Sequence, residues 1–297
     1  MRPRKPAFSY LKPETLEEAL ELLNRHYPRA RLVAGGTDVM VQAKRGKLNA
    51  DVLISLNRLE SLRYIREDNN RVYIGGLTHL RDLETSDLIA RRLPALADAA
   101  RNMASVQIRN VATVAGNLSN AAPSADTAPP LLVSGADVKL ANRNGGRVVP
   151  LNKFFKGPGQ TVMDHGEILT ELSIPIPHRP YSQAFWKHSR RKAMDLALVS
   201  VAFHLELEDD LETCALARIG LGVAGPTPLR TPEAENRLKG VKITPEALTD
   251  TGDASCDETL CRDSIRGEAW YREEIIRVMV RRMGLLALER ARAAAGR

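Results

Sequence analysis

The segment Pro175-Ile176-Pro177-His178-Arg179-Pro180 constrains the fold of this chain more than any other feature. Proline lacks a backbone N–H and fixes φ, so three prolines in six residues cannot continue a strand or a helix. The length of 297 residues allows two domains, one on each side of this segment. We expect an N-terminal domain at 1–177, with subdomains at about 1–58 and 59–177, and a C-terminal domain at 178–297.

Strands and helices alternate in the first part of the chain. The sequence Thr15-Leu16-Glu17-Glu18 is a capping box, and apolar residues that recur every three or four positions up to Leu23 predict a helix. Thr78 and Ser86 are candidate N-caps, and a loop is expected at 113–130. The remaining expectations are strands at 31–34, 51–55, around Val72 and Ile74, 136–142, 147–150 and 167–175, and helices at 38–44 and 94–103.

The part after the prolines is expected to contain a sheet followed by helices. Its β-rich stretches are 183–188, 197–207 and 213–223. Thr231-Pro232-Glu233 begins a helix, because proline is tolerated at the first helical position. The stretch 270–295 has the apolar and basic faces of one long helix. The whole chain is therefore predicted to be α+β.

Charge and cysteine content limit the class of protein. The formal net charge is +7, which indicates an acidic partner without identifying it. Three cysteines, Cys214, Cys256 and Cys261, make neither a disulfide framework nor a complete metal or iron–sulfur set. We therefore predict no metal site. With no apolar signal segment and no membrane-spanning run, we expect a cytoplasmic protein.

Two glycine-containing loops are candidates for binding a phosphate cofactor. Gly35-Gly36-Thr37-Asp38 follows a strand, and adjacent glycines allow successive N–H groups to point at one anion. The alternative is a tight turn without a ligand. The loop from Thr113 to Asp126 holds two Asn, two Ser and an Asp between apolar flanks, and these polar groups need partners. A bound polar cofactor would supply them, and the alternative is a solvated surface loop.

A third glycine cluster, Gly220-Leu221-Gly222-Val223-Ala224-Gly225, matches G-x-G-x-x-G but not its required context. A dinucleotide fingerprint ends at a helix N-terminus that offers free N–H donors. Pro226 and Pro228 follow at once here, and proline has no N–H to offer. We interpret this cluster as an apolar strand that ends at a turn.

The first two loops, in this order and spacing, resemble those of a known family. The chain is similar to the FAD-binding (medium) subunit of the xanthine dehydrogenase / carbon monoxide dehydrogenase family of molybdenum hydroxylases. The matching stretches run along the whole chain: LVAGGTDVMVQ (32–42), QIRNVATVAGNLSNAAPSADTAPPLL (107–132), GEIL (166–169), FWKHSRRKAMDLALVSVAFHL (185–205), GVAGPTPLRTPEAE (222–235) and SIRGEAWYR (264–272).

The resemblance implies a fold and a cofactor site. The fold is a two-subdomain FAD-binding domain of the vanillyl-alcohol-oxidase/PCMH type, not a Rossmann fold, followed by a smaller α+β C-terminal domain. The backbone of 32–39 would bind the pyrophosphate, Asp126 the ribityl or ribose side, and Lys187 would lie near the flavin ring. The residues implied to bind the cofactor are Leu32, Val33, Ala34, Gly35, Gly36, Thr37, Asp38, Val39, Thr113, Gly116, Asn117, Asp126, Leu169 and Lys187.

The sequence departs from the family pattern at Ala115, where members usually have a glycine. If that position required a positive φ, alanine would cost about 1 kcal/mol. We expect FAD to bind with a slightly altered loop.

The function implied by the resemblance is electron transfer. A molybdenum-cofactor large subunit would hydroxylate the organic substrate, and electrons would pass through two [2Fe-2S] clusters of a small subunit to FAD in this chain. The chain would then reduce an external acceptor such as NAD, and its site residues would position the cofactor rather than act as acids or bases. Overall similarity favours the xanthine dehydrogenase type.

Two other classes of function remain as alternatives. A stand-alone flavin oxidase would need a base over the flavin, and the sequence offers no candidate. A non-catalytic nucleic-acid-binding protein is suggested only by the charge of +7, because the basic residues are spread along the chain without interleaved aromatics.

Overall fold

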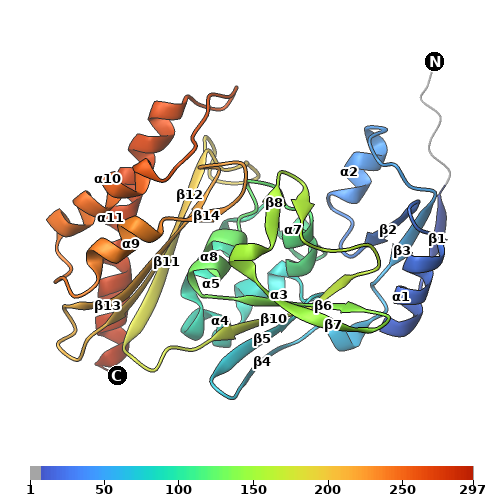
Figure 1. The fold of residues 1–297 in the computed structure, drawn as a ribbon, viewed down its shortest axis with the longest axis horizontal. Coiled ribbons are helices and arrows are strands. Elements are labelled where there is room, and N and C mark those ends of the chain that lie inside the picture. The colour runs from blue at the N-terminus through green and yellow to red at the C-terminus, as the bar shows by residue number, and fades with distance from the viewer. Residues whose placement is uncertain (1–7, 297) are drawn as a thin grey trace.

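The computed structural model describes residues 8–296, in which three main sheets follow one another along the chain (Figure 1). The first sheet is parallel, with the order β1-β3-β2, formed by β1 (Ser9–Leu11), β2 (Ala30–Val33) and β3 (Val52–Ser55). The helix α1 (Leu16–Arg25) connects β1 to β2, and the Thr15 hydroxyl caps it by accepting from the Glu18 N–H. A short helix, α2 (Val39–Lys44), follows β2 after the Gly35-Gly36 turn.

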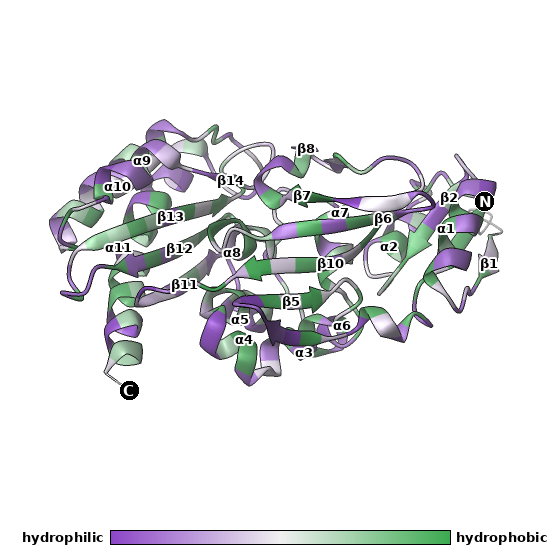
Figure 2. Ribbon diagram, turned by 60° about the horizontal axis from the view of Figure 1, so that its bottom comes forward, coloured by the Kyte–Doolittle hydropathy of each residue, from purple (hydrophilic) through white to green (hydrophobic). Residues whose placement is uncertain are grey.

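The second sheet has five antiparallel strands in the order β4-β5-β10-β6-β7. Helices between β5 and β6 pack on it and form the largest apolar cluster, which includes Leu83, Leu96 and Leu131. In Figure 2 the strands β5 and β10 are green along much of their length, as this burial requires. The strands are β4 (Ile65–Asp68), β5 (Arg71–Gly75), β6 (Asp137–Asn142), β7 (Gly145–Pro150) and β10 (Ile168–Pro175). The helices are α3 (Leu80–Thr85), α4 (Asp87–Arg92), α5 (Pro94–Asn102), α6 (Val106–Arg109), α7 (Val114–Ser119) and α8 (Ala128–Val133).

Short elements complete this region. A 3-10 turn, η1 (Glu60–Leu62), precedes β4, and a second one, η2 (Leu151–Lys153), follows β7. After η2, the two short strands β8 (Phe155–Gly157) and β9 (Gln160–Thr161) pair as a small hairpin.

The third sheet is antiparallel, with the order β11-β12-β13-β14, and helices cover both of its faces. The helix α11 packs on one face, while α5 and α8 from the second region pack on the other. Almost every residue of β12 is buried as a result. The strands are β11 (Tyr181–His188), β12 (Val199–Leu207), β13 (Cys214–Gly222) and β14 (Leu229–Arg230). The helices are α9 (Pro232–Leu238), α10 (Pro245–Asp257) and α11 (Ala269–Ala295).

The register of β11 decides the direction in which Lys187 points. Phe185 lies opposite Ala202 of β12, and both pack with α5 and α8 residues. Because side chains alternate along a strand, Lys187 lies on that same face, directed toward the second region rather than toward α11.

The expected loop at 113–130 is wrong in part, because it contains α7 and the first residues of α8. The residues of α7 include glycine and asparagine, which are weak helix formers, so propensity does not reveal this helix. The Thr113 hydroxyl caps it instead, and Val114 and Leu118 are buried. Thr78 is not an N-cap, since its hydroxyl bonds the Tyr64 backbone, whereas Ser86 does cap α4.

The G-x-G-x-x-G cluster begins in β13, which ends at Gly222, and residues 223–225 form the bend after it. This confirms the expected strand that ends at a turn. A Cβ at Gly220 would lie 2.7 Å from the Pro129 carbonyl oxygen of α8. The glycine therefore allows the β13 backbone to lie directly against a helix of the second region.

Candidate cofactor site

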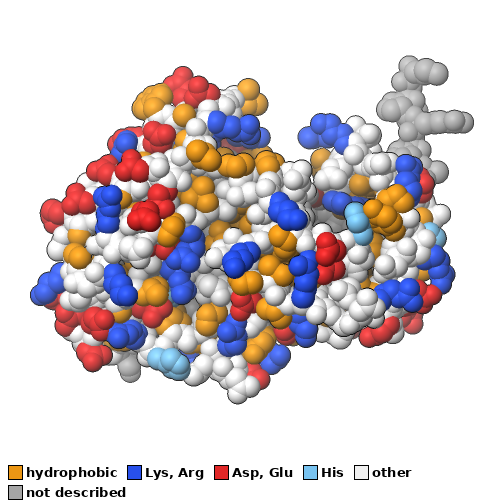
Figure 3. Space-filling view, viewed as in Figure 1, with side chains coloured by type: hydrophobic (Ala, Val, Ile, Leu, Met, Phe, Trp, Pro, Cys, Tyr) orange, Lys and Arg blue, Asp and Glu red, His pale blue; other side chains and the backbone are white. Residues whose placement is uncertain are grey.

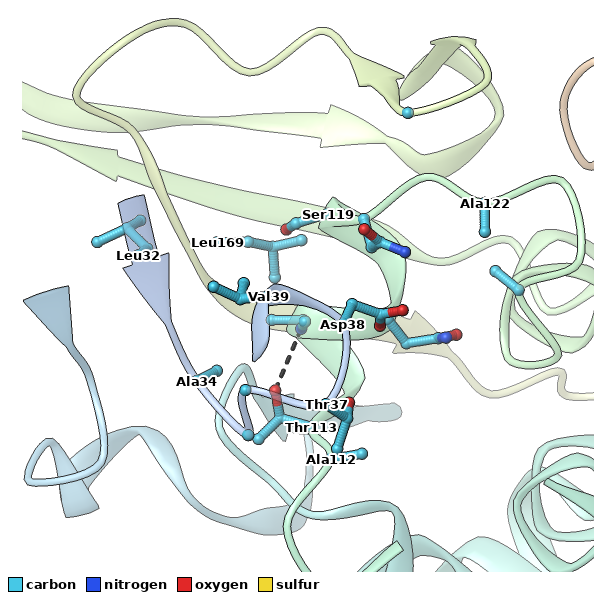
Figure 4. Close-up of a pocket in the computed structure, with 18 of the residues that line it drawn as sticks. Leu32, Ala34, Thr37, Asp38, Val39, Ala112, Thr113, Ser119, Ala122 and Leu169 are labelled. Carbon is cyan, nitrogen blue, oxygen red and sulfur yellow. Dashed lines mark hydrogen bonds between the residues drawn. The ribbon is translucent and has the colours of Figure 1, made fainter. Parts of the chain in front are cut away.

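A cavity of about 1050 Å³ opens where the three regions meet. The first region contributes the turn after β2, the second contributes α7 and the segments around it, and the third contributes the end of β11. Figure 3 shows the molecule hollowed beside α2, with Lys and Arg side chains near the hollow. Figure 4 shows that side chains from the first two regions point into this space.

The turn at Gly35-Gly36-Thr37-Asp38 has the donor pattern of an anion site. Gly36 has φ +71°, a conformation that glycine adopts without strain. Within residues 8–296, the N–H groups of Gly35, Gly36, Thr37 and Asp38 donate no hydrogen bond. Four successive unpaired donors beside a cavity can bind a phosphate group. Burial raises the pKa of the Asp38 carboxyl in the same turn.

Gly35 joins this turn to the second region. A Cβ at this position would lie 2.0 Å from the Val111 carbonyl oxygen, so only glycine allows the two backbones to come this close. The contact places the turn against the residues that lead into α7.

The start of α7 forms the adjoining wall of the cavity. The Gly116 N–H donates to the Thr113 hydroxyl at 3.1 Å, as the dashed line in Figure 4 shows. The Asn117 side-chain oxygen accepts from the Thr127 hydroxyl at 2.6 Å, which fixes the amide beside the cavity. Ala115 lies within this helix and has no positive φ, so the condition under which alanine would cause strain here is not met.

Asp126 and Lys187 form a buried ion pair in the cavity wall. The Lys187 ammonium donates to Asp126 Oδ2 at 2.7 Å, and each side chain is 6% exposed. Burial raises the pKa of the Asp126 carboxyl, although Lys187 opposes that rise. The second oxygen, Oδ1, is buried and has no hydrogen-bond partner among the described residues. A buried acceptor without a partner is costly, so this oxygen fits the hydroxyl group of a ligand.

The structure brings together the residues that sequence analysis predicted, with one exception. Leu32, Ala34, Gly35, Gly36, Thr37, Asp38, Val39, Thr113, Gly116, Asn117, Asp126, Leu169 and Lys187 all line the cavity. Val33 does not, because its side chain packs into a separate cluster with Ala50 and Leu53. As the last residue of β2, it supports the turn from behind.

Several lining residues were not predicted from the sequence. Tyr27 and His165, with ring centroids 4.2 Å apart, border the cavity, and so do the turn Met103–Ser105 and the segment Met194–Leu196. No spacing motif marks these residues, since they come from connections between elements. The segment Met194–Leu196 lies inside the quoted stretch 185–205, and Met103–Ser105 lies just before the stretch 107–132.

The donor set fits FAD. Free N–H groups suit its diphosphate, and the unpartnered Asp126 oxygen suits a ribityl or ribose hydroxyl. The cavity between the regions, of about 1050 Å³, has room for a large cofactor that contacts all three of them. Among the described residues, no helix has the length and apolar surface needed to cross a membrane.

Two known protein families match this chain, each over a different part of its length. Residues 6–177 match the FAD binding domain in molybdopterin dehydrogenase. Residues 184–287 match the CO dehydrogenase flavoprotein C-terminal domain.

Curated relatives match the chain along nearly its whole length. The glyceraldehyde dehydrogenase medium chain of Sulfolobus acidocaldarius is 32% identical, over 92% of this chain and 96% of its own. The xanthine dehydrogenase FAD-binding subunit of Escherichia coli O157:H7 is 33% identical, over 97% of both chains. A solved structure of carbon monoxide dehydrogenase from Hydrogenophaga pseudoflava superposes with a TM-score of 0.91 at 32% identity, covering 97% of this chain and 99% of that one.

Proposed function

The chain belongs to the FAD-binding medium subunits of the xanthine dehydrogenase / carbon monoxide dehydrogenase family of molybdenum hydroxylases, a family of oxidoreductases, and from this premise we propose its place in electron transfer. The chain holds FAD in the cavity between its three regions. It takes electrons one at a time from the [2Fe-2S] clusters of a small partner subunit. It passes them in pairs to an external acceptor such as NAD, which takes two electrons and one proton. Bound FAD supplies the conversion between one-electron and two-electron transfer.

One observation supports this proposal above all: two sets of polar groups that lack hydrogen-bond partners lie in the same cavity. The N–H groups of Gly35 to Asp38 lack acceptors, and Asp126 Oδ1 lacks a donor. A cofactor with a diphosphate and neighbouring hydroxyls supplies both. We assign the diphosphate to the turn after β2 and a ribityl or ribose hydroxyl to Asp126.

Lys187 has the electrostatic role in this assignment. Its ammonium group is buried and held in place by Asp126, so it presents a fixed positive charge in a site of low dielectric. A fixed cation beside the flavin ring favours the negative charge that develops on reduction. Lys187 therefore tunes the cofactor and transfers no proton. Leu169, 3% exposed on β10, offers an apolar contact for the cofactor.

The organic substrate is assigned to a partner, the molybdenum-cofactor large subunit. Relatives named for glyceraldehyde, xanthine and carbon monoxide dehydrogenases are 32–33% identical to this chain. Relatives that are named for different substrates are thus equally similar to this chain. This is expected if the chain binds a cofactor that all these enzymes share. The three cysteines are free, which agrees with a reducing compartment, and we propose the cytoplasm.

Anaerobic reduction of the purified complex tests this proposal. With the reducing substrate present, flavin absorbance at its visible band should fall only when the iron–sulfur and molybdenum subunits are present, and NAD should restore it. Reduction of the isolated FAD-loaded chain by a small alcohol, without partners, would contradict the proposal and favour a stand-alone oxidase.

A further inference from the structure

Arg109, the last residue of α6, is a buried arginine whose hydrogen bonds reach two separate segments. Only 7% of the residue is exposed. Its Nε and Nη2 donate to the two carboxylate oxygens of Glu84, at 2.7 and 3.2 Å. Its Nη1 donates to the Met103 carbonyl oxygen at 2.8 Å. Burying an arginine is costly unless it is paired and hydrogen-bonded, so this geometry fixes Met103 relative to α3.

The Met103 carbonyl begins a strained turn. Ala104 has φ +50°, a left-handed conformation that is unfavourable for a residue with a Cβ. Ser105 then caps α6 by accepting from the Ile108 N–H. Strain of this kind persists only where surrounding contacts enforce it, and the Arg109 guanidinium is such a contact. Met103, Ala104, Ser105 and Ile108 all line the cavity.

The packing of α5 on β11 locates this turn along the cavity. The Tyr181 hydroxyl donates to the Arg92 carbonyl just before α5, and Phe185 packs with Ala95 and Ala99. The helix and the strand thus run in the same direction, side by side. Met103, after the end of α5, therefore lies at the same end of the cavity as Lys187, where the proposed function places the flavin ring.

We propose that the buried Arg109–Glu84 pair is a positioning device for the flavin ring, holding the Met103–Ser105 turn as the cavity wall at the Lys187 end. Arg109 itself does not line the cavity and acts through Met103. The Met103 thioether suits this wall, because sulfur makes favourable contacts with aromatic rings. The inference rests on the proposed binding of FAD.

Titration of the flavin-free full chain tests this role. Arg109→Met removes all three hydrogen bonds and should raise the dissociation constant for FAD by about tenfold or more, with a changed shape of the flavin visible band. The dissociation constant for ADP, measured as a competitor, should stay within about twofold of wild type. ADP lacks the flavin ring, so a loss confined to FAD locates the defect at the flavin end. Arg109→Lys, which keeps the charge, should lie between Arg109→Met and wild type.

Two other Arg–Glu pairs, both more exposed at the arginine, provide controls. Arg92 binds both oxygens of Glu67 at 3.0 and 2.8 Å, with the same 25-residue separation, and neither residue lines the cavity. Arg230 pairs with the buried Glu235, also outside the cavity. Arg92→Met and Arg230→Met should leave both dissociation constants unchanged, whatever they do to thermal stability.

Each outcome decides the question. Wild-type affinity for FAD in Arg109→Met, or equal weakening of FAD and ADP, would overturn the positioning role. If Arg109→Met does not fold, Arg109→Lys decides, and wild-type FAD affinity in it would overturn the role equally. Wild-type protein that binds no FAD would instead overturn the proposed function, independently of any variant.

Discussion

Within residues 8–296, the contact between the first and second regions is built differently from the contact between the second and third. Where the second region meets the third, apolar side chains pack without an open space around a few buried hydrogen bonds, such as that of Gln183 to Ser134. The apolar residues are Ala95, Ala99, Val133, Phe185 and Ala202. Where the first region meets the second, an apolar cluster that includes Leu20, Leu77 and Ile168 fills one part of the contact, and the chains touch closely at Gly35. A cavity of about 1050 Å³ remains beside them. A cavity lined by successive N–H groups and a carboxylate oxygen without partners indicates that a ligand completes the open junction.

The largest effect is expected at the tight point of the open junction. Gly35→Ala would place a Cβ 2.0 Å from the Val111 oxygen, so the turn and its unpaired N–H groups must move. We expect FAD affinity to fall by at least about a hundredfold, equivalent to ~2.7 kcal/mol. Fluorescence titration of the flavin-free chain measures this. Gly157→Ala, whose new Cβ would have ordinary contacts at 3.5 Å, is the control and should bind as wild type.

A second prediction separates binding from stability in the same cavity. Asp126→Asn leaves Lys187 buried and unpaired, which should cost about 3 kcal/mol of unfolding free energy. The double variant Asp126→Asn/Lys187→Met removes the charge and should recover most of that stability. It should still bind FAD at least about tenfold more weakly than wild type. Thermal unfolding and FAD titration check the two parts. A double variant with wild-type affinity would show that the pair has no role in binding.

The closed junction should respond in the opposite way. A Cβ at Gly220 would lie 2.7 Å from the Pro129 oxygen and 2.9 Å from Val133 Cγ1. Gly220→Ala should therefore destabilise the fold by about 1–3 kcal/mol, as overpacking does. The folded fraction should keep wild-type FAD affinity. A change in affinity without a change in stability would contradict the distinction between the junctions.

The smallest effect is a pH dependence at the closed junction. His204 is buried, and its Nδ1 faces Gln183 Nε2, which donates to Ser134 of the second region. Burial lowers the pKa of His204, although Glu206 opposes this, and Arg218 and Arg230 lower it further.

The folded pKa of His204 lies below the unfolded value of about 6.5, so its contribution to stability is present above that pH. It is lost as the pH falls toward the folded pKa. Unfolding free energy should thus decline below about pH 6.5 by more in wild type than in His204→Gln. Equal pH profiles for the two proteins would contradict this account.

Helices and strands could be predicted from the sequence where local features, such as a cap or a periodic apolar pattern, determine them. The helix α1 begins at the capping box, and β13 and α11 follow their periodic patterns, so these were predicted nearly to the residue. The helix α7 was missed, because its Gly116 and Asn117 are weak helix formers and tertiary contacts hold it. The helix α10 was also missed, although Thr244 caps it and Pro245 stands at its first position.

At the candidate site too, residues within a sequence motif could be predicted, and residues placed only by tertiary packing could not. The glycine turn and the polar loop have motifs, so most of their residues were anticipated and now line one cavity. Met103 and the Arg109–Glu84 pair depend on the packing of α3, α5 and α6, which no spacing in the sequence reveals. We propose that the domain boundary at 177/178 holds as well, because the sheets on its two sides share no strand.

We propose that the open junction binds one FAD. Its most direct test is the amount of FAD bound by the full-length chain after saturation and removal of excess, measured from released flavin absorbance. We expect about one FAD per chain for wild type and almost none for Gly35→Ala. Wild-type chain that is folded and retains no FAD, or equal retention by both proteins, would contradict it.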